Sequence, residues 1–126
     1  MISNPGKWLI VAGSINAAAA VTLGAFAAHS LRDKLGDTAL NTFQTGVHYH
    51  FMHALGLFAV AFVSTQLPQN NALPWVGYLM QAGIILFCGS LYILALGGSR
   101  LFGPVTPIGG ISFILSWLLL AYAVLK

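Results

Sequence analysis

Four long apolar runs limit what this chain can fold into more than any other feature of its sequence. They cover roughly residues 8–28, 47–66, 75–97 and 105–125. As a helix that rises 1.5 Å per residue, each run is long enough to cross a hydrocarbon core about 30 Å thick. Only 6% of the 126 residues are charged, whereas soluble domains carry about a quarter. The sequence therefore predicts an integral membrane protein.

The expected fold is an all-α bundle of four transmembrane helices that forms one domain over residues 1–126. The connection at residues 29–46 is unlike the others, because apolar residues recur in it at helical spacing. We interpret it as an interfacial helical segment that leads into the second helix, with Asp37 as the N-cap. A Thr-Pro pair predicts the start of the fourth helix, with Thr106 as N-cap and Pro107 as first residue.

Four spans place both chain ends on one side of the membrane, called side A here, together with the turn at residues 67–74. The opposite side, side B, then carries the connection at 29–46 and the loop at 98–104. Side B holds three Lys or Arg side chains and side A holds two. The positive-inside rule therefore favours a cytoplasmic side B and periplasmic termini.

The composition and motifs also restrict the class of function. The five Lys and Arg residues are scattered, whereas a nucleic-acid surface needs a basic patch or stripe, so no nucleic-acid partner is expected. Motifs of metalloproteases and serine hydrolases are missing, and the serines have no adjacent base. The sequence favours a non-enzymatic protein without a cofactor. The expected partners are membrane lipid and either another membrane protein or further copies of this chain.

Three of the four histidines lie within six residues, in the stretch TGVHYHFMHALGLF at 45–58. At 100° per residue, His48 and His50 point to nearly opposite sides of a helix, whereas His50 and His53 share a face. His48 is therefore expected at the membrane interface, and the other two are expected inside the bundle. His29 ends the first span on side B, from where it could approach them.

Three interpretations of these histidines stay open. They could hydrogen-bond to backbone carbonyls or to one another at a helix junction. They could ligate a metal or haem, although their spacing matches no recognised zinc pattern. They could also form a proton relay, since histidine titrates near neutral pH. A separate pairing is expected between Asn16 and Gln81, whose matched depths in the first and third spans predict a buried interhelical hydrogen bond.

The stretch GPVTPIGG at 103–110 is rich in glycine and proline. It lacks the lysine and the preceding strand of a phosphate-binding P-loop, so helix initiation explains it better. An anionic lipid headgroup could still bind at this helix N-terminus, with Arg100 and Thr106 as the candidate contacts.

Three segments on side B resemble a known family. They are GAFAAHSL at 24–31, FQTGVHYHFMHALGLF at 43–58 and FGPVTPIGGISFILSW at 102–117. In these segments, and in their order and spacing over nearly the whole chain, the sequence is similar to the YgdD-like family of small uncharacterised membrane proteins. The resemblance implies four transmembrane helices and a place in the bacterial inner membrane. It implies no activity.

The resemblance also bears on the histidines. In the family pattern, histidines stand at the positions of His29 and His53, and glutamine often stands at the position of His50. The resemblance therefore singles out His29 and His53, with Thr45. His50 shares a helix face with His53, so the candidate functional cluster is His29, Thr45, His50 and His53. We expect a non-enzymatic binding or assembly factor that uses this polar cluster on side B to engage a partner or lipid. The alternative is a histidine-based transporter or a metal- or haem-binding protein. Histidine nitrogens that converge within about 4 Å of one point would favour metal binding.

Overall fold

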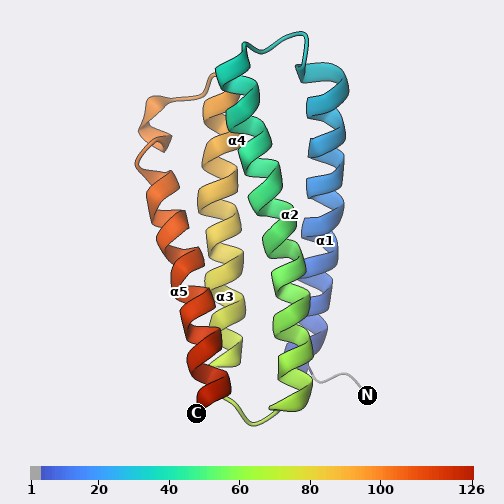
Figure 1. Ribbon diagram of the computed structural model, residues 1–126, viewed down its shortest axis with the longest axis vertical. Helices are drawn as coiled ribbons and strands as arrows, with labels where there is room; N and C mark the ends of the chain where they lie inside the picture. The colour runs from blue at the N-terminus through green and yellow to red at the C-terminus, as the bar shows by residue number, and fades with distance from the viewer. Residues whose placement is uncertain (1–3) are drawn as a thin grey trace.

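The computed structural model describes residues 4–126, and these residues form helices joined by short turns, with no strand among them (Figure 1). In chain order the elements are α1 (Asn4–Phe26), the π-helical turn η1 (Ala27–Leu31), α2 (Asp37–Gln66), α3 (Leu73–Gly83), the π-helical turn η2 (Ile84–Cys88), α4 (Gly89–Ala95), the 3-10 turn η3 (Arg100–Phe102) and α5 (Val105–Leu125).

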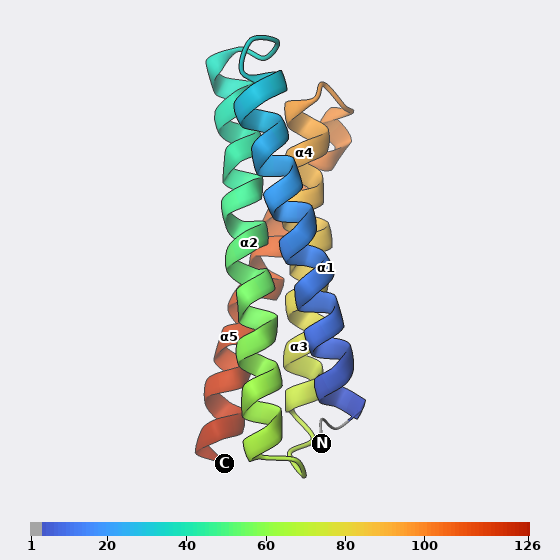
Figure 2. The same cartoon turned by 90° about the vertical axis from the view of Figure 1, so that its right-hand side faces the viewer.

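These elements form four rods of membrane-spanning length. The stretches Gly6–Leu31, Asp37–Gln66, Leu73–Ala95 and Arg100–Leu125 are all long and apolar enough to cross a bilayer. The expected all-α, four-transmembrane-helix fold is therefore confirmed. Figures 1 and 2 show the rods side by side, with the first turn of α1, the α2–α3 turn and the end of α5 at one end of the bundle. That end is side A.

Two helices begin differently from the sequence prediction. Asp37 is the first residue of α2 and Gly36 is its N-cap, so the expected cap lies in the first turn, where a carboxylate still interacts favourably with the helix dipole. The expected N-cap of α5 is also wrong. Pro104 takes the cap position, because its backbone is already helical, and Thr106 falls inside the first turn. There its hydroxyl pairs with that of Ser90 in α4, at 2.5 Å between the oxygens.

α2 is the central rod of the bundle. It packs along the whole of α1 and also against α3, η2 and α4, while α5 packs on α3 and η2. The main core lies among these rods and is built from fully buried apolar residues, among them Leu9, Leu57, Val60, Val76 and Met80. A smaller core around Phe43 closes the side-B end. The backbones of α2 and α5 do not pack closely against each other. Side chains fill the space between these two helices, and Trp117 of α5 bonds to His53 of α2 across it.

Candidate functional site

His50 lies near the middle of α2 and is hydrogen-bonded to both neighbouring rods. Its Nδ1 is 2.9 Å from the hydroxyl oxygen of Tyr92 in α4, and its Nε2 is 3.0 Å from Oδ1 of Asn16 in α1. Asn16 Nδ2 in turn donates to Oε1 of Gln81 in α3 at 2.7 Å. The predicted Asn16–Gln81 bond is thereby confirmed. It is one part of a four-residue polar network that ties three of the four rods together.

A second bond of Asn16 fixes the direction of every donor in this network. Asn16 Nδ2 also lies 2.8 Å from the carbonyl oxygen of Ala12, which can only accept, so the amide nitrogen must face it. Asn16 Oδ1 then faces His50 Nε2 as an acceptor, and Nε2 must carry the hydrogen. In the neutral ring, His50 Nδ1 is left to accept from the Tyr92 hydroxyl. All three side-chain hydrogen bonds of the network therefore form with a neutral His50.

His53 lies one turn further along α2 and is the opposite tautomer. Its Nδ1 is 2.8 Å from the carbonyl oxygen of Tyr49, so Nδ1 carries the hydrogen. Its Nε2 accepts from the indole nitrogen of Trp117 in α5 at 3.0 Å. The imidazole stacks on Phe113 with ring centroids 3.6 Å apart. An indole N–H can only donate, so this geometry requires a neutral His53.

A glycine next to each histidine makes room for its aromatic partner. Gly46 lies one turn before His50, and a Cβ added there would come within 2.8 Å of the Tyr92 ring. Gly56 lies one turn after His53, and an added Cβ would lie 2.7 Å from the Met80 sulfur and 3.3 Å from the Trp117 ring. The two glycines therefore let an aromatic residue from a different rod approach α2 at each histidine.

A groove opens beside His53 between α2 and α5. Its volume is about 320 Å³, and its walls are nearly all apolar and aromatic, with Tyr49, Met52, Phe87, Phe113 and Trp117 as the main contributors. Tyr49, Met52 and Trp117 are between 39% and 53% exposed. The groove lies at the middle of two spans, so it faces the hydrocarbon core of the bilayer. The imidazole of His53 is its principal polar group.

The structure does not bring the four candidate residues together. His29 is exposed on η1, and Thr45 is exposed with its hydroxyl donating to the carbonyl of Asn41 in its own helix. His50 and His53 are 6% and 2% exposed. The reason is depth: α2 begins at residue 37, so His50 lies about 20 Å along the helix from its side-B end. The expected side-B cluster is split between the surface and the bundle interior.

The other expected contacts have separate outcomes. His48 is exposed and takes no part in either arrangement. Arg100 is exposed on η3, the Thr106 hydroxyl is paired with that of Ser90, and a headgroup contact by these two residues stays a prediction. Within residues 4–126, no group of three His, Cys, Asp or Glu side chains is placed to hold a metal ion.

Sequence reasoning missed Tyr92 and Trp117, the aromatic partners of the two histidines. Both are amphipathic, and in an isolated span they resemble residues of an interfacial aromatic belt. The glycines beside the histidines were the available signal. A small residue one turn from a buried polar residue indicates that a large side chain from another helix approaches there.

Comparison with known proteins finds relatives whose function is also unknown. Residues 23–110 match the family described as Protein of unknown function (DUF423). The chain is 48% identical over 120 residues to the UPF0382 membrane protein YwdK of Bacillus subtilis (strain 168), with 95% of this chain and 98% of that protein covered. It is 43% identical to a UPF0382 membrane protein of Staphylococcus epidermidis, with 95% and 97% covered. No solved structure matches.

These matches confirm the expected membrane location and the expected family of small membrane proteins without an assigned activity. The relatives carry the DUF423 and UPF0382 names, and the YgdD-like name stays a prediction.

Proposed function

We propose a function for this chain, which belongs to the DUF423 family of proteins of unknown function. It is a non-enzymatic membrane protein that binds a lipid in the groove between α2 and α5. The observation that carries the proposal is the aromatic groove of about 320 Å³ at mid-span, with a buried imidazole in its wall. Ligand sites are typically apolar hollows of about this size or larger with few, fixed polar groups.

The groove is a better binding surface than the polar network around His50. Both histidines are buried and use both ring nitrogens in hydrogen bonds, so the difference between the two places is the groove itself. The network around His50 stabilises the bundle by linking the side chains of three rods to one another. The groove beside His53 is instead open along one side, where the acyl chains of the bilayer lie.

The size of the groove favours a lipid over a partner helix. Its volume of about 320 Å³ falls in the range of about 300–1,000 Å³ that is typical of small-molecule sites. Towards side A, the same interval between α2 and α5 ends in a recess of mixed polar and apolar lining that includes Gln66 and Lys126. At 1.5 Å per residue, His53 lies about 20 Å from the side-A end of α2. This is comparable to the roughly 15 Å depth of one leaflet's hydrocarbon, so one phospholipid could reach from groove to recess.

Filling the groove tests the proposal. Gly110 lies in its wall, and a Cβ added there would meet the Phe87 ring at 3.7 Å, an ordinary contact. Gly110→Leu therefore occupies the groove without displacing the backbone. Gly89→Leu is the matched control, because a Cβ at Gly89 meets nothing within 4 Å and the residue lies outside the groove.

The measurement is native mass spectrometry of protein released from detergent. With phosphatidylcholine as the added lipid, we expect the control variant Gly89→Leu to retain as much lipid as the unmodified chain, and Gly110→Leu to retain at least fivefold less. Equal retention by all three proteins would contradict the proposal.

We further propose that the protein lies in the bacterial inner (plasma) membrane with side B in the cytoplasm and both termini outside. The support is the excess of Lys and Arg on the side-B connections. Alkaline phosphatase fused after Lys126 is active only if that end is outside the cytoplasm, and a fluorescent-protein fusion gives the reciprocal signal. An inactive phosphatase fusion with a fluorescent partner would reverse the assignment.

The polar network favours one alternative, a histidine-based proton relay. Tyr92 and Gln81 lie at its two ends, about 16 Å apart along one rod at 1.5 Å per residue. This covers about half of a 30 Å hydrocarbon core. Proton flux into liposomes, reported by an enclosed pH dye, distinguishes the two functions. A flux that disappears in His50→Leu, but persists in Gly110→Leu, would favour the relay.

A further inference from the structure

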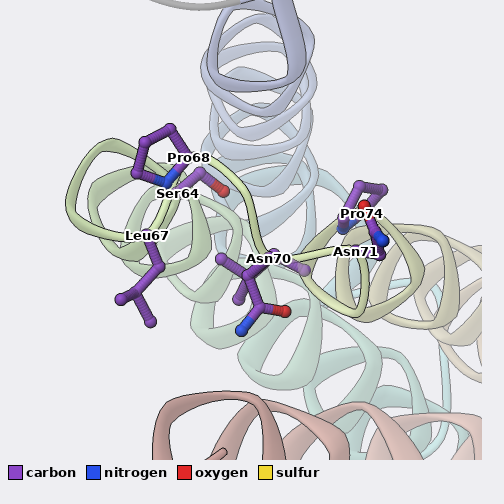
Figure 3. Close-up of a pocket in the computed structure, with 7 residues that line it drawn as sticks. Ser64, Leu67, Pro68, Asn70, Asn71 and Pro74 are labelled. Carbon is purple, nitrogen blue, oxygen red and sulfur yellow. The ribbon is translucent and has the colours of Figure 1, made fainter.

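We propose a second binding site, for the primary ammonium group of a phospholipid headgroup, in a pocket under the α2–α3 turn. The pocket has a volume of about 170 Å³ and lies at side A between the last turn of α2 and the first turn of α3 (Figure 3). No charged side chain among the described residues lines it. The hydrogen-bonding groups that remain free around it indicate what it would hold.

Ser64 supplies the first of these groups. Its side chain is 6% exposed, and its Oγ is the one buried side-chain oxygen or nitrogen in residues 4–126 that has no hydrogen-bond partner. In Figure 3 this oxygen points towards the space enclosed by the turn. A buried hydroxyl without a partner costs about 1–3 kcal/mol, so a ligand that bonds to it recovers that energy.

Pro68 frees a second acceptor at the same residue. In a continuing helix the carbonyl of Ser64 would accept from the N–H of residue 68, and proline has none. The pocket is thus lined by a residue whose carbonyl has no N–H donor at position 68 and whose hydroxyl has no partner, at the negative end of the 30-residue helix α2. This arrangement favours a cation with several N–H donors over an anion.

The side chain of Asn70 in the turn already has its partners. Asn70 Nδ2 donates to the carbonyl of Ala123 in α5, and Asn70 Oδ1 accepts from the N–H of Ala72. α3 begins at the other wall of the pocket without a side-chain N-cap; Pro74 has no N–H, which leaves the N–H groups of Leu73 and Trp75 uncapped by a side chain. A free helix N-terminus attracts phosphate. A headgroup with an ammonium near Ser64 and a phosphate near the start of α3 therefore matches both walls.

The pocket also lies at the depth where headgroups are found. Trp75 and Tyr78, in the first two turns of α3, form an edge-to-face pair with ring centroids 5.4 Å apart, and Trp8 of α1 stacks on Tyr78 at 5.3 Å. Such aromatic groups mark the membrane–water interface. The pocket shares no lining residue with the α2–α5 groove, but it adjoins the recess at the end of α5 through Leu67, Pro68 and Asn70.

The experiment compares phosphatidylethanolamine with phosphatidylcholine, whose quaternary ammonium has no N–H. Each lipid is mixed with the purified protein, and its retention is measured by native mass spectrometry. Every variant is also made in the Gly110→Leu chain, so that groove-bound lipid does not contribute. We expect the unmodified protein and Gly110→Leu to prefer phosphatidylethanolamine by about tenfold, the effect of one charge-assisted hydrogen bond.

Ser64→Ala removes the hydroxyl without leaving a partner unpaired, since Oγ has none. The variant should fold as the parent does and should lose most of the preference. Ser64→Thr, which keeps a hydroxyl, should retain part of it. Equal retention of both lipids by the parent would overturn the proposal, as for a pocket that holds only water. An unchanged preference in Ser64→Ala would overturn it as well.

Discussion

His50 and His53 are the same residue type, one turn apart on the same helix, yet their surroundings differ in almost every respect. His50 donates from Nε2 and is enclosed by polar side chains of α1 and α4. His53 donates from Nδ1 to its own helix, bonds to one indole of α5, and lies in the wall of a lipid-facing groove. Position on α2 decides that both are buried. Their partners decide that one closes the bundle and the other borders an opening.

Replacing His50 should give the largest effect of the changes at this pair. His50→Leu leaves Asn16 Oδ1 and the Tyr92 hydroxyl without a partner. Each of these two half-buried groups costs about 1–3 kcal/mol when it loses its partner, so we expect the free energy of unfolding to fall by about 2–6 kcal/mol. Titration of the micelle-embedded protein with sodium dodecyl sulfate measures the change.

His50→Gln is the matched control for that change, because its amide offers one donor and one acceptor in place of the two ring nitrogens. It should recover at least half of the lost stability. If Leu and Gln at this position destabilise the protein equally, the packing of the ring matters and the hydrogen bonds of the network do not.

The corresponding change at His53 should be smaller, because only one interhelical hydrogen bond is lost. Trp117→Phe removes the indole donor and retains an aromatic ring over the groove. Hydrogen bonds between membrane helices are worth about 0.6–1.7 kcal/mol, so a loss of about 1 kcal/mol is expected in the same titration. A loss as large as that of His50→Leu would remove the energetic distinction between the two sites.

A methyl group added inside the groove should have almost no effect on stability. Gly110→Ala places a Cβ at 3.7 Å from the Phe87 ring, in ordinary contact. A change of less than about 0.5 kcal/mol is expected, as for substitutions that disturb no buried feature. A loss of several kcal/mol would mean that the groove is closed in the membrane and that helices pack against this position.

The last prediction concerns the tautomers of the two histidines in the unmodified protein. The ¹⁵N spectrum of histidine-labelled protein in micelles near neutral pH should contain two neutral imidazoles of opposite tautomer. His50 should carry its hydrogen on Nε2 and His53 on Nδ1. The His50→Gln spectrum assigns the two signals. Identical tautomers would contradict the donor directions that Ala12 and Trp117 impose.

The sequence was most informative where run length, helical phase or depth along a span decides the outcome. Apolar run length predicted the four rods, and helical phase correctly placed His50 and His53 inside the bundle. Matched depth predicted the Asn16–Gln81 bond, because two polar residues at one level in adjacent spans have few other partners.

The sequence was least informative where the arrangement of neighbouring helices decides which residues meet. The expected proximity of His29 to the other histidines assumed that α2 enters the membrane near residue 47, but the helix runs unbroken from Asp37 and carries His50 far from its end. The partners Tyr92 and Trp117 depend on which rods flank α2, and an arrangement of rods is not encoded in the pattern of any one of them. Thr106 was misassigned because a helix can start at the residues before a Thr-Pro pair.

The central place of α2 has a consequence for the order in which the chain is assembled. α2 has the lowest mean hydropathy of the four spans, 1.3 against 1.8, 1.8 and 2.1, and it carries both buried histidines. Of the interhelical partners, only Asn16 is synthesised before it; Tyr92 and Trp117 emerge later from the ribosome. The span that organises the finished bundle is therefore the least hydrophobic one when it leaves the translocon. The hydrogen bonds of its histidines to Tyr92 and Trp117 form only after the later helices are made.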